Sequence, residues 1–156
     1  MTVCQRRPLR WLDPVTPDPT SYVDVGLPET VWNLITNVGR DFLHTQGYGT
    51  AGVANGLNYI ALSNDTVGET VSSTTLSNEI VANGLSRAQG VVAHTAGTNT
   101  TTVILTFTCA TSAQAAQKAA LFTASSAGTM NHVLGFTQRS LQVGDQLQIS
   151  YTLTLG

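Results

Sequence analysis

The sequence LQISYTLTL at residues 147–155 alternates between two kinds of side chain. Large apolar residues occupy the odd positions, and glutamine, serine or threonine occupies the even positions. Because successive side chains of a β-strand point to opposite faces of a sheet, this alternation indicates a strand with one buried face and one polar face. The end of the chain therefore predicts an antiparallel sheet that covers a core on one side.

Short apolar segments separated by turn residues extend this pattern back to residue 58. Gly144 and Asp145 supply a turn signal directly before the last strand. The other predicted strands cover residues 58–63, 85–95 with an interruption at Gly90, 100–110, 116–124 and 130–139. A polar loop is predicted at residues 64–73, and residues 74–82 fit either a strand or one helical turn. About six to eight short strands at this spacing predict a mainly β protein, an antiparallel β-sandwich of jelly-roll or immunoglobulin-like topology over residues 58–156.

The predicted strand 100–110 collects apolar side chains on one face. These residues are Val103, Leu105, Phe107 and Cys109. Cys109 is therefore interpreted as a small buried hydrophobic residue. Cys4 lies far from it in the sequence, and the pair matches no zinc or redox spacing. A disulfide between the two is disfavoured in a reducing cytosol.

Residues 28–46 are predicted to form one amphipathic helix. Pro28 suits the first helical position, and Glu29 is favourably placed in the first turn. Apolar residues then recur at helical spacing, at Val31, Leu34, Ile35, Val38 and Phe42. A linker rich in glycine and alanine, residues 47–57, ends the helix and completes a unit of residues 28–57.

Residues 1–27 are predicted to form an extended N-terminal arm. Four prolines remove backbone donors and push the residues before them into extended conformations. The arm is too apolar for a solvated tail, so we expect it to lie on this subunit or on a neighbour. Arginine and aromatic side chains are frequent anchors of interfaces. The predicted partner contacts are Arg6, Arg7, Arg10, Trp11 and Tyr22. We expect no order in the arm before assembly, because little burial offsets its ordering entropy.

The composition excludes several classes of protein. The chain has seven basic and nine acidic residues, a net charge of −2 and a single lysine, Lys118. This low charge gives weak self-repulsion, which suits a surface that packs against neighbours. The 24 threonines favour strands. The basic residues are too scattered to bind nucleic acid. No segment approaches the roughly 18 apolar residues of a membrane span, and the first ten residues lack the core of a signal peptide.

Arg87 and Arg139 are predicted to form salt bridges, either within the sandwich or at an interface.

No catalytic, cofactor or metal site is predicted. The sequence has no nucleophile elbow, no glycine loop for phosphate and no dinucleotide fingerprint. His94 and His132 would bind a metal only if they met across strands, and a polar role at strand ends is the simpler interpretation. Asp65 and Glu69 share a loop that lacks the oxygen-ligand pattern of a calcium site. A hydrolase would need at least two of the following in one pocket: His94, His132, Glu79 and Asp145.

Several short motifs together resemble a widespread type of small bacteriophage structural protein. They are LITNVG (34–39), NYIALSND (58–65), TTL (74–76), LSRA (85–88), TFT (106–108), KAALF (118–122), GTM (128–130) and GDQL (144–147). The resemblance covers about residues 30–156, and the arm lies outside it. It implies a capsid cement (decoration) protein, or a component of a tail or fibre.

The expected function is that of a non-enzymatic virion protein on the capsid surface, assembled in the cytoplasm of a bacterial host. Its expected partners are the major capsid protein and two further copies of itself, in a homotrimer. An extended arm of residues 1–27 could cross a neighbouring subunit, since an extended chain spans about 3.3–3.6 Å per residue. Repetition around a symmetry axis would then add avidity. The alternative is a tail or head-fibre subunit that binds a host surface glycan.

Overall fold

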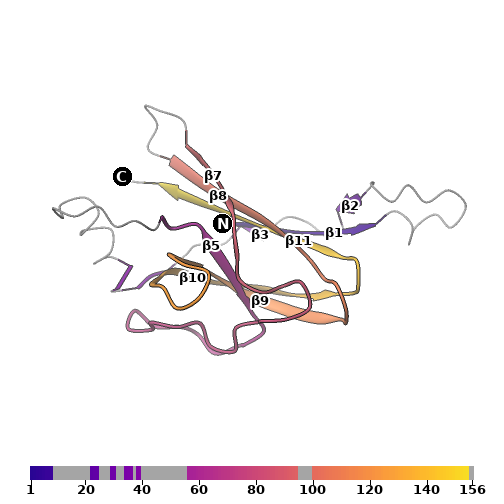
Figure 1. Cartoon of the computed structure of the whole chain (residues 1–156), viewed down its shortest axis with the longest axis horizontal. Coiled ribbons are helices and arrows are strands. Elements are labelled where there is room, and N and C mark those ends of the chain that lie inside the picture. The colour runs from indigo at the N-terminus through magenta and orange to yellow at the C-terminus, as the bar shows by residue number, and fades with distance from the viewer. Residues whose placement is uncertain are drawn as a thin grey trace, which may run out of the picture.

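The computed structural model of this chain describes residues 1–8, 22–24, 29–30, 34–36, 38–39, 56–94 and 100–154. These residues form two antiparallel sheets and almost no helix (Figure 1). The mainly β class predicted from the alternating pattern is confirmed. No helix among the described residues is long and apolar enough to span a membrane.

The two sheets interleave segments from both ends of the chain. Sheet A has the order β2 (Tyr22–Asp24), β1 (Thr2–Pro8), β11 (Gln146–Thr154), β8 (Thr100–Thr108) and β7 (Val91–His94), and β3 (Glu29–Thr30) also pairs with β1. Sheet B has the order β4 (Leu34–Ile35), β10 (Met130–Leu141), β9 (Gln114–Phe122), β5 (Tyr59–Ser63) and β6 (Ala88–Gln89). The strands predicted at residues 58–63, 100–110, 116–124, 130–139 and 147–155 correspond to β5, β8, β9, β10 and β11. The strand predicted at residues 85–95 is instead two short strands, β6 and β7, which belong to different sheets.

One buried apolar cluster joins the two sheets. It contains Val103, Phe107, Leu147, Ile149 and Tyr151 from sheet A and Ile60, Leu62, Ala119, Leu121 and Phe136 from sheet B. The odd positions of β11 enter this cluster, whereas Thr152 and Thr154 are exposed, as the alternation predicts. Cys109 is fully buried and free, which confirms its interpretation as a core residue. Burial, and secondarily the Asp145 carboxylate, raises the pKa of its thiol.

The predicted helix over residues 28–46 is wrong at Glu29–Thr30 and at Leu34–Ile35. Glu29–Thr30 form β3 and pair with β1, and Leu34–Ile35 form β4 and pair with His132 and Val133 of β10. Helical backbone occurs at Val38 and Gly39 among the described residues. Sheet pairing therefore overrides the helical spacing of the apolar residues. The linker at residues 47–55 lies outside the described residues.

The predicted separation of an arm from the β domain is also wrong for Thr2–Pro8. These residues form β1, which pairs with β11 from Thr2 opposite Ser150 to Arg6 opposite Gln146. Val3 is fully buried in the main core. The segment is extended, as predicted, but it lies on its own sheet. The pairing with β11 and the burial of Val3 involve no second subunit. The expectation that residues 1–27 lack order before assembly stays a prediction.

A second apolar layer lies on the side of sheet B that faces away from the main core. It contains Tyr59, Ala61, Ala120, Phe122, Met130 and Val133, with Leu76 packed among them. Leu76 belongs to residues 64–87, which run between β5 and β6 and which we call the clasp loop (Figure 1). Within it, residues 74–82 form neither a regular strand nor a helical turn, but a turn with an isolated bridge from Glu79 to Ser63.

Tyr151 gives a test of the packing in the main core. Its side chain is almost fully buried, and its hydroxyl has no hydrogen-bond partner. A buried hydroxyl without a partner destabilises the folded state, so Tyr151→Phe is expected to raise the free energy of unfolding by about 1 kcal/mol. Urea denaturation measures this change. The half-buried Tyr59 supplies the control Tyr59→Phe, for which we expect no such gain. A loss of stability in Tyr151→Phe would contradict the packing described.

Candidate functional site

The first turn of the clasp loop is held by side-chain hydrogen bonds. The Ser63 hydroxyl donates to the Ser77 carbonyl at 2.6 Å and accepts from the Asp65 amide at 3.0 Å. Asp65 Oδ1 then accepts from the Val67 amide at 3.1 Å, a local turn that aspartate side chains favour. Further along, the Ser77 amide donates to Glu69 Oε1 at 3.2 Å. These contacts direct the Asp65 and Glu69 carboxylates toward β9.

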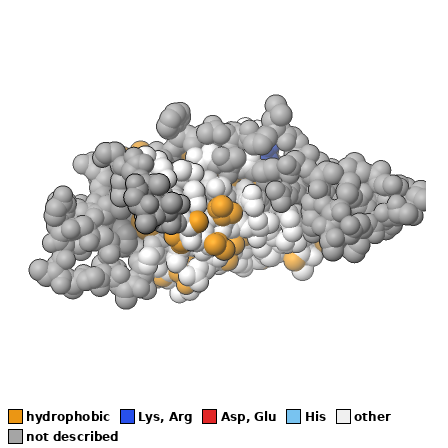
Figure 2. Space-filling model, turned by 90° about the horizontal axis from the view of Figure 1, so that it is seen from above, with side chains coloured by type: hydrophobic (Ala, Val, Ile, Leu, Met, Phe, Trp, Pro, Cys, Tyr) orange, Lys and Arg blue, Asp and Glu red, His pale blue; other side chains and the backbone are white. Residues whose placement is uncertain are grey.

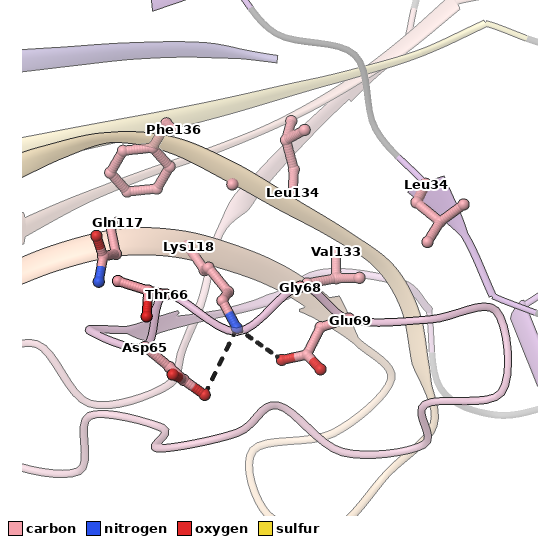
Figure 3. Close-up of a pocket in the computed structure, with 11 residues that line it drawn as sticks. Leu34, Asp65, Thr66, Gly68, Glu69, Gln117, Lys118, Val133, Leu134 and Phe136 are labelled. Carbon is pink, nitrogen blue, oxygen red and sulfur yellow. Dashed lines mark hydrogen bonds and ion pairs between the residues drawn. The ribbon is translucent and has the colours of Figure 1, made fainter.

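Lys118 of β9 completes this cluster (Figure 3). Its Nζ lies 3.1 Å from Glu69 Oε1 and 3.7 Å from Asp65 Oδ2, and it donates to the Val67 carbonyl. The side chains of Lys118 and Glu69 are each 6% exposed, and that of Asp65 is 12% exposed. One ammonium therefore occupies the centre of an oxygen-lined turn, where it offsets two carboxylates that have largely left water.

An open hollow of about 550 Å³ lies beside this cluster. Figure 3 shows Lys118, Asp65 and Glu69 on one side of it and Leu34 of β4 on another. Gly135 of β10, which pairs with Lys118, contributes no side chain to fill it. The full lining is Leu34, Asp65, Thr66, Gly68, Glu69, Gln117, Lys118, Val133, Leu134, Gly135 and Phe136. The hollow thus combines apolar walls with carboxylate, amide and hydroxyl groups.

Arg87 anchors the other end of the clasp loop. Its guanidinium donates to both oxygens of Glu79, at 2.9 and 2.6 Å, in the bidentate geometry that arginine favours. It also donates to the carbonyls of Ala124 at 3.2 Å and Ala127 at 2.6 Å, in the turn between β9 and β10. The guanidinium stacks 3.5 Å from the centre of the Phe122 ring. Of the alternatives for Arg87, a salt bridge within the domain is therefore confirmed.

The candidate residues for a hydrolase have separate structural contacts. Glu79 is bound by Arg87, and Asp145 Oδ2 accepts from the Gln142 amide in the turn before β11, as its prediction as a turn residue requires. His132 lies in β10 of sheet B, whereas His94 lies in β7 of sheet A. Among the described residues, no group of three or more histidine, cysteine, aspartate or glutamate side chains could hold a metal ion. The four residues named for a hydrolase are therefore found in separate contacts or in different sheets.

His132 introduces a pH dependence of stability. It is buried, its Nδ1 has no hydrogen-bond partner, and burial lowers its pKa from 6.5 to about 4. Between these values the unfolded chain binds a proton that the folded chain does not, so stability falls as the pH drops from about 6.5 toward 4. We expect a loss of about 2 kcal/mol at pH 5 relative to pH 7.5.

Chemical denaturation at the two pH values measures the contribution of His132. Because other groups also titrate, the informative quantity is the difference between the wild type and His132→Gln. The variant should lack about 2 kcal/mol of the fall in stability. Equal falls in the two proteins would show that His132 is not held neutral in the folded state.

The structure describes the side chain of none of the five predicted partner contacts. Arg6 and Arg7 belong to β1 and Tyr22 belongs to β2, while Arg10 and Trp11 lie outside the described residues.

The sequence analysis missed the role of Lys118. The available signal was its position as the only lysine, inside the apolar strand QAAQKAALF. A lysine in such a strand requires buried partners, and the nearby loop carboxylates Asp65 and Glu69 supply them.

Comparisons with protein-family models, curated proteins and solved structures found no match to this chain. Inference about its function therefore rests on the residues and their contacts. Two features of the described residues bear on it. One is the set of internally paired charges beside an open hollow, and the other is the uncharged outer face of strands β8 and β11 in sheet A.

Proposed function

We propose that this chain is a non-enzymatic structural protein of a bacteriophage particle, a capsid cement or decoration protein that binds neighbouring coat subunits on the capsid surface. The motif resemblance suggested this role. The observation that carries it is the chemistry of the outer face of sheet A. On β8 and β11 this face is an array of uncharged side chains, which a neighbouring subunit can cover without burying an unpaired charge.

The part of the outer face of sheet A that carries this proposal is formed by the even-numbered residues of β8 and β11, and Arg6 of β1 pairs with Gln146 at its margin. Their odd-numbered neighbours Val103, Phe107, Leu147, Ile149 and Tyr151 are buried in the core. Opposite pairs on the outer face are Thr100–Thr154, Thr102–Thr152, Ile104–Ser150, Thr106–Gln148 and Thr108–Gln146. All ten residues are half-buried or exposed, and none is charged. Gln148 Nε2 donates to Thr106 Oγ1 at 3.2 Å, so part of the array is already ordered.

The internal use of charge supports a structural role. Lys118 and Arg87 bind the carboxylates of the clasp loop, so these groups stabilise the domain and are not arranged for proton transfer. The two sheets on one core fit the β-sandwich of the prediction, in which case sheet A presents its polar face outward. Because Thr2–Pro8 belong to this sheet, we now assign the main contact with the major capsid protein to the sheet face.

The symmetry of a capsid is the reason to propose that this protein forms a homotrimer. A homotrimer at a local threefold position would present three copies of the face to the coat subunits, which multiplies weak contacts. Arg6, Arg7, Arg10, Trp11 and Tyr22 remain proposed contacts with a partner subunit. We place the protein in the virion after its synthesis in the bacterial cytoplasm.

Binding to capsids that lack the protein tests this proposal. We expect saturable binding at a fixed ratio to the coat subunit. The double variant Thr106→Lys/Thr152→Lys puts two charges on the outer face and should weaken binding at least about tenfold, because interfacial charges without partners are costly. Val81→Lys is the matched control, since Val81 is 77% exposed in the clasp loop. Absence of binding, or equal binding by all three proteins, would contradict the proposal.

The hollow beside Lys118 favours the alternative, a tail or head-fibre subunit that binds a host glycan. Its volume of about 550 Å³ is that of a small-molecule site, and it pairs an apolar wall with Asp65, Glu69 and Gln117. A glycan array would test this alternative. A ligand that the wild type binds and that Gly135→Leu excludes would support it, and a wild type that binds no glycan would remove it.

A further inference from the structure

The segment Ala88–His94 forms an edge of both sheets. Among the described residues, β6 is paired with β5 at the end of sheet B, and β7 is paired with β8 at the end of sheet A. Gly90 joins them, and its amide donates to the Asn58 carbonyl at 2.7 Å. A Cβ at this position would lie 2.9 Å from Val103 Cγ1, so a glycine is needed where the chain passes from one sheet to the other.

The β7 part of this edge exposes apolar side chains in both directions. Val91 is 73% exposed and Val92 is 49% exposed, and Ala93 is exposed as well. Because neighbouring residues of a strand point to opposite faces, solvent reaches both faces of the sheet at this edge. Ile104, which pairs with Val91, extends the apolar surface onto β8. Figure 2, viewed from the side on which β7 and β8 lie in Figure 1, shows hydrophobic side chains grouped among uncharged ones.

This edge lacks the features that normally prevent strands from pairing between molecules. Such features are lysine or another charge, proline, and bulges that turn the edge away. The sequence of β7 is VVAH, with no lysine, acid or proline, and its pairing with β8 runs without a shift in register. In an antiparallel strand, every second residue directs its N–H and C=O groups away from its neighbour. The outer side of β7 thus offers both backbone groups and apolar side chains.

We infer that β7 binds β7 of a second copy of this chain, as an antiparallel pair about a twofold axis that joins two sheets A into one. Charge favours a second copy as the occupant, because no residue of Ala88–His94 carries an acidic, lysine or arginine side chain that two identical edges would bring together. A twofold register centred on Val92 places Val92 opposite Val92 of the second copy and Val91 opposite its Ala93, so that apolar residues meet on both faces. This twofold interface concerns free copies of the chain in solution. It goes beyond the proposed contact with coat subunits and the proposed trimer on the capsid, and it depends on neither.

Sedimentation of the purified full chain over a concentration series tests the inference. We expect the wild type to form a dimer, and Val91→Lys to weaken dimerisation at least about tenfold, because it places two lysines beside the twofold axis. Val81→Lys, with the same change at a site of similar exposure in the clasp loop, should dimerise like the wild type. Ala93→Lys is a second edge variant, to be used if Val91→Lys does not fold.

Three outcomes would overturn the inference. They are a wild type that stays monomeric throughout the series, a trimer whose formation the edge variants leave unchanged, and an equal loss of association in Val81→Lys and the edge variant. Because no capsid is present in this experiment, its failure is separate from a failure of coat binding. Conversely, Thr106→Lys/Thr152→Lys should leave the dimer intact.

Discussion

Replacement of Lys118 with methionine should lower the free energy of unfolding by about 4 kcal/mol, because it leaves two carboxylates in a largely buried site without their cation. Methionine keeps most of the volume and the apolar stem of lysine, so the loss reports on charge and not on a cavity. Nζ also donates to the Val67 carbonyl, which loses that donor. Urea denaturation at pH 7 of the wild type and the variant measures the difference.

The matched control for Lys118 removes all three charges. The triple variant Asp65→Asn/Glu69→Gln/Lys118→Met should recover most of the lost stability, since a buried ion cluster can often be replaced by neutral groups at little cost. Asp65→Asn alone should cost less than Lys118→Met, because Glu69 remains paired at 3.1 Å. A loss below about 1 kcal/mol in Lys118→Met would mean that water solvates the carboxylates, as at a surface salt bridge.

The second large effect is expected at Arg87. Arg87→Ala removes a bidentate ion pair, two hydrogen bonds to carbonyls and the stacking on Phe122, and should destabilise the domain by about 3 kcal/mol. Because the arginine connects the clasp loop to the turn after β9, hydrogen exchange should also increase in both segments. Denaturation and exchange measured on the same variant give the two effects.

Arg87→Lys and Glu79→Gln separate charge from geometry. A lysine retains the charge but loses the planar fork and most of the stacking, so it should restore less than half of the lost stability. Glu79→Gln should be milder than Arg87→Ala, because the guanidinium keeps its contacts with Ala124, Ala127 and Phe122. If Arg87→Lys were as stable as the wild type, the bidentate geometry would have no special role.

Alternation predicted the strands well because it reports directly on burial. In β11 the odd residues face the core and the even residues face outward, and the sequence alone contains that information. At residues 28–46, the helical spacing of the apolar residues led to the prediction of a helix where the structure has strands at 29–30 and 34–35. Leu34 and Ile35 suit a helix by their spacing, but their backbone pairs with His132 and Val133, which lie about a hundred residues later. No local pattern encodes a pairing at that distance.

The candidate site likewise consists of contacts between residues that lie far apart in the sequence. Lys118 and Glu69 lie 49 residues apart, and Arg87 and Ala127 lie 40 apart. The sequence identified Asp65 and Glu69 as carboxylates of one loop, but it could not show that a lysine of the same chain supplies their cation. Likewise, the prolines and apolar residues of 1–27 indicated an extended segment, and only the register with β11 showed that Thr2–Pro8 lie on their own sheet.

An electron cryo-microscopy map of the intact particle tests the central claim, that this is a structural subunit of the capsid exterior. We expect density for the β domain at symmetry-related positions on the head, with the Thr- and Gln-rich outer face of β8 and β11 against coat subunits. A head without this density, or a subunit whose sheet A outer face points to solvent, would contradict it.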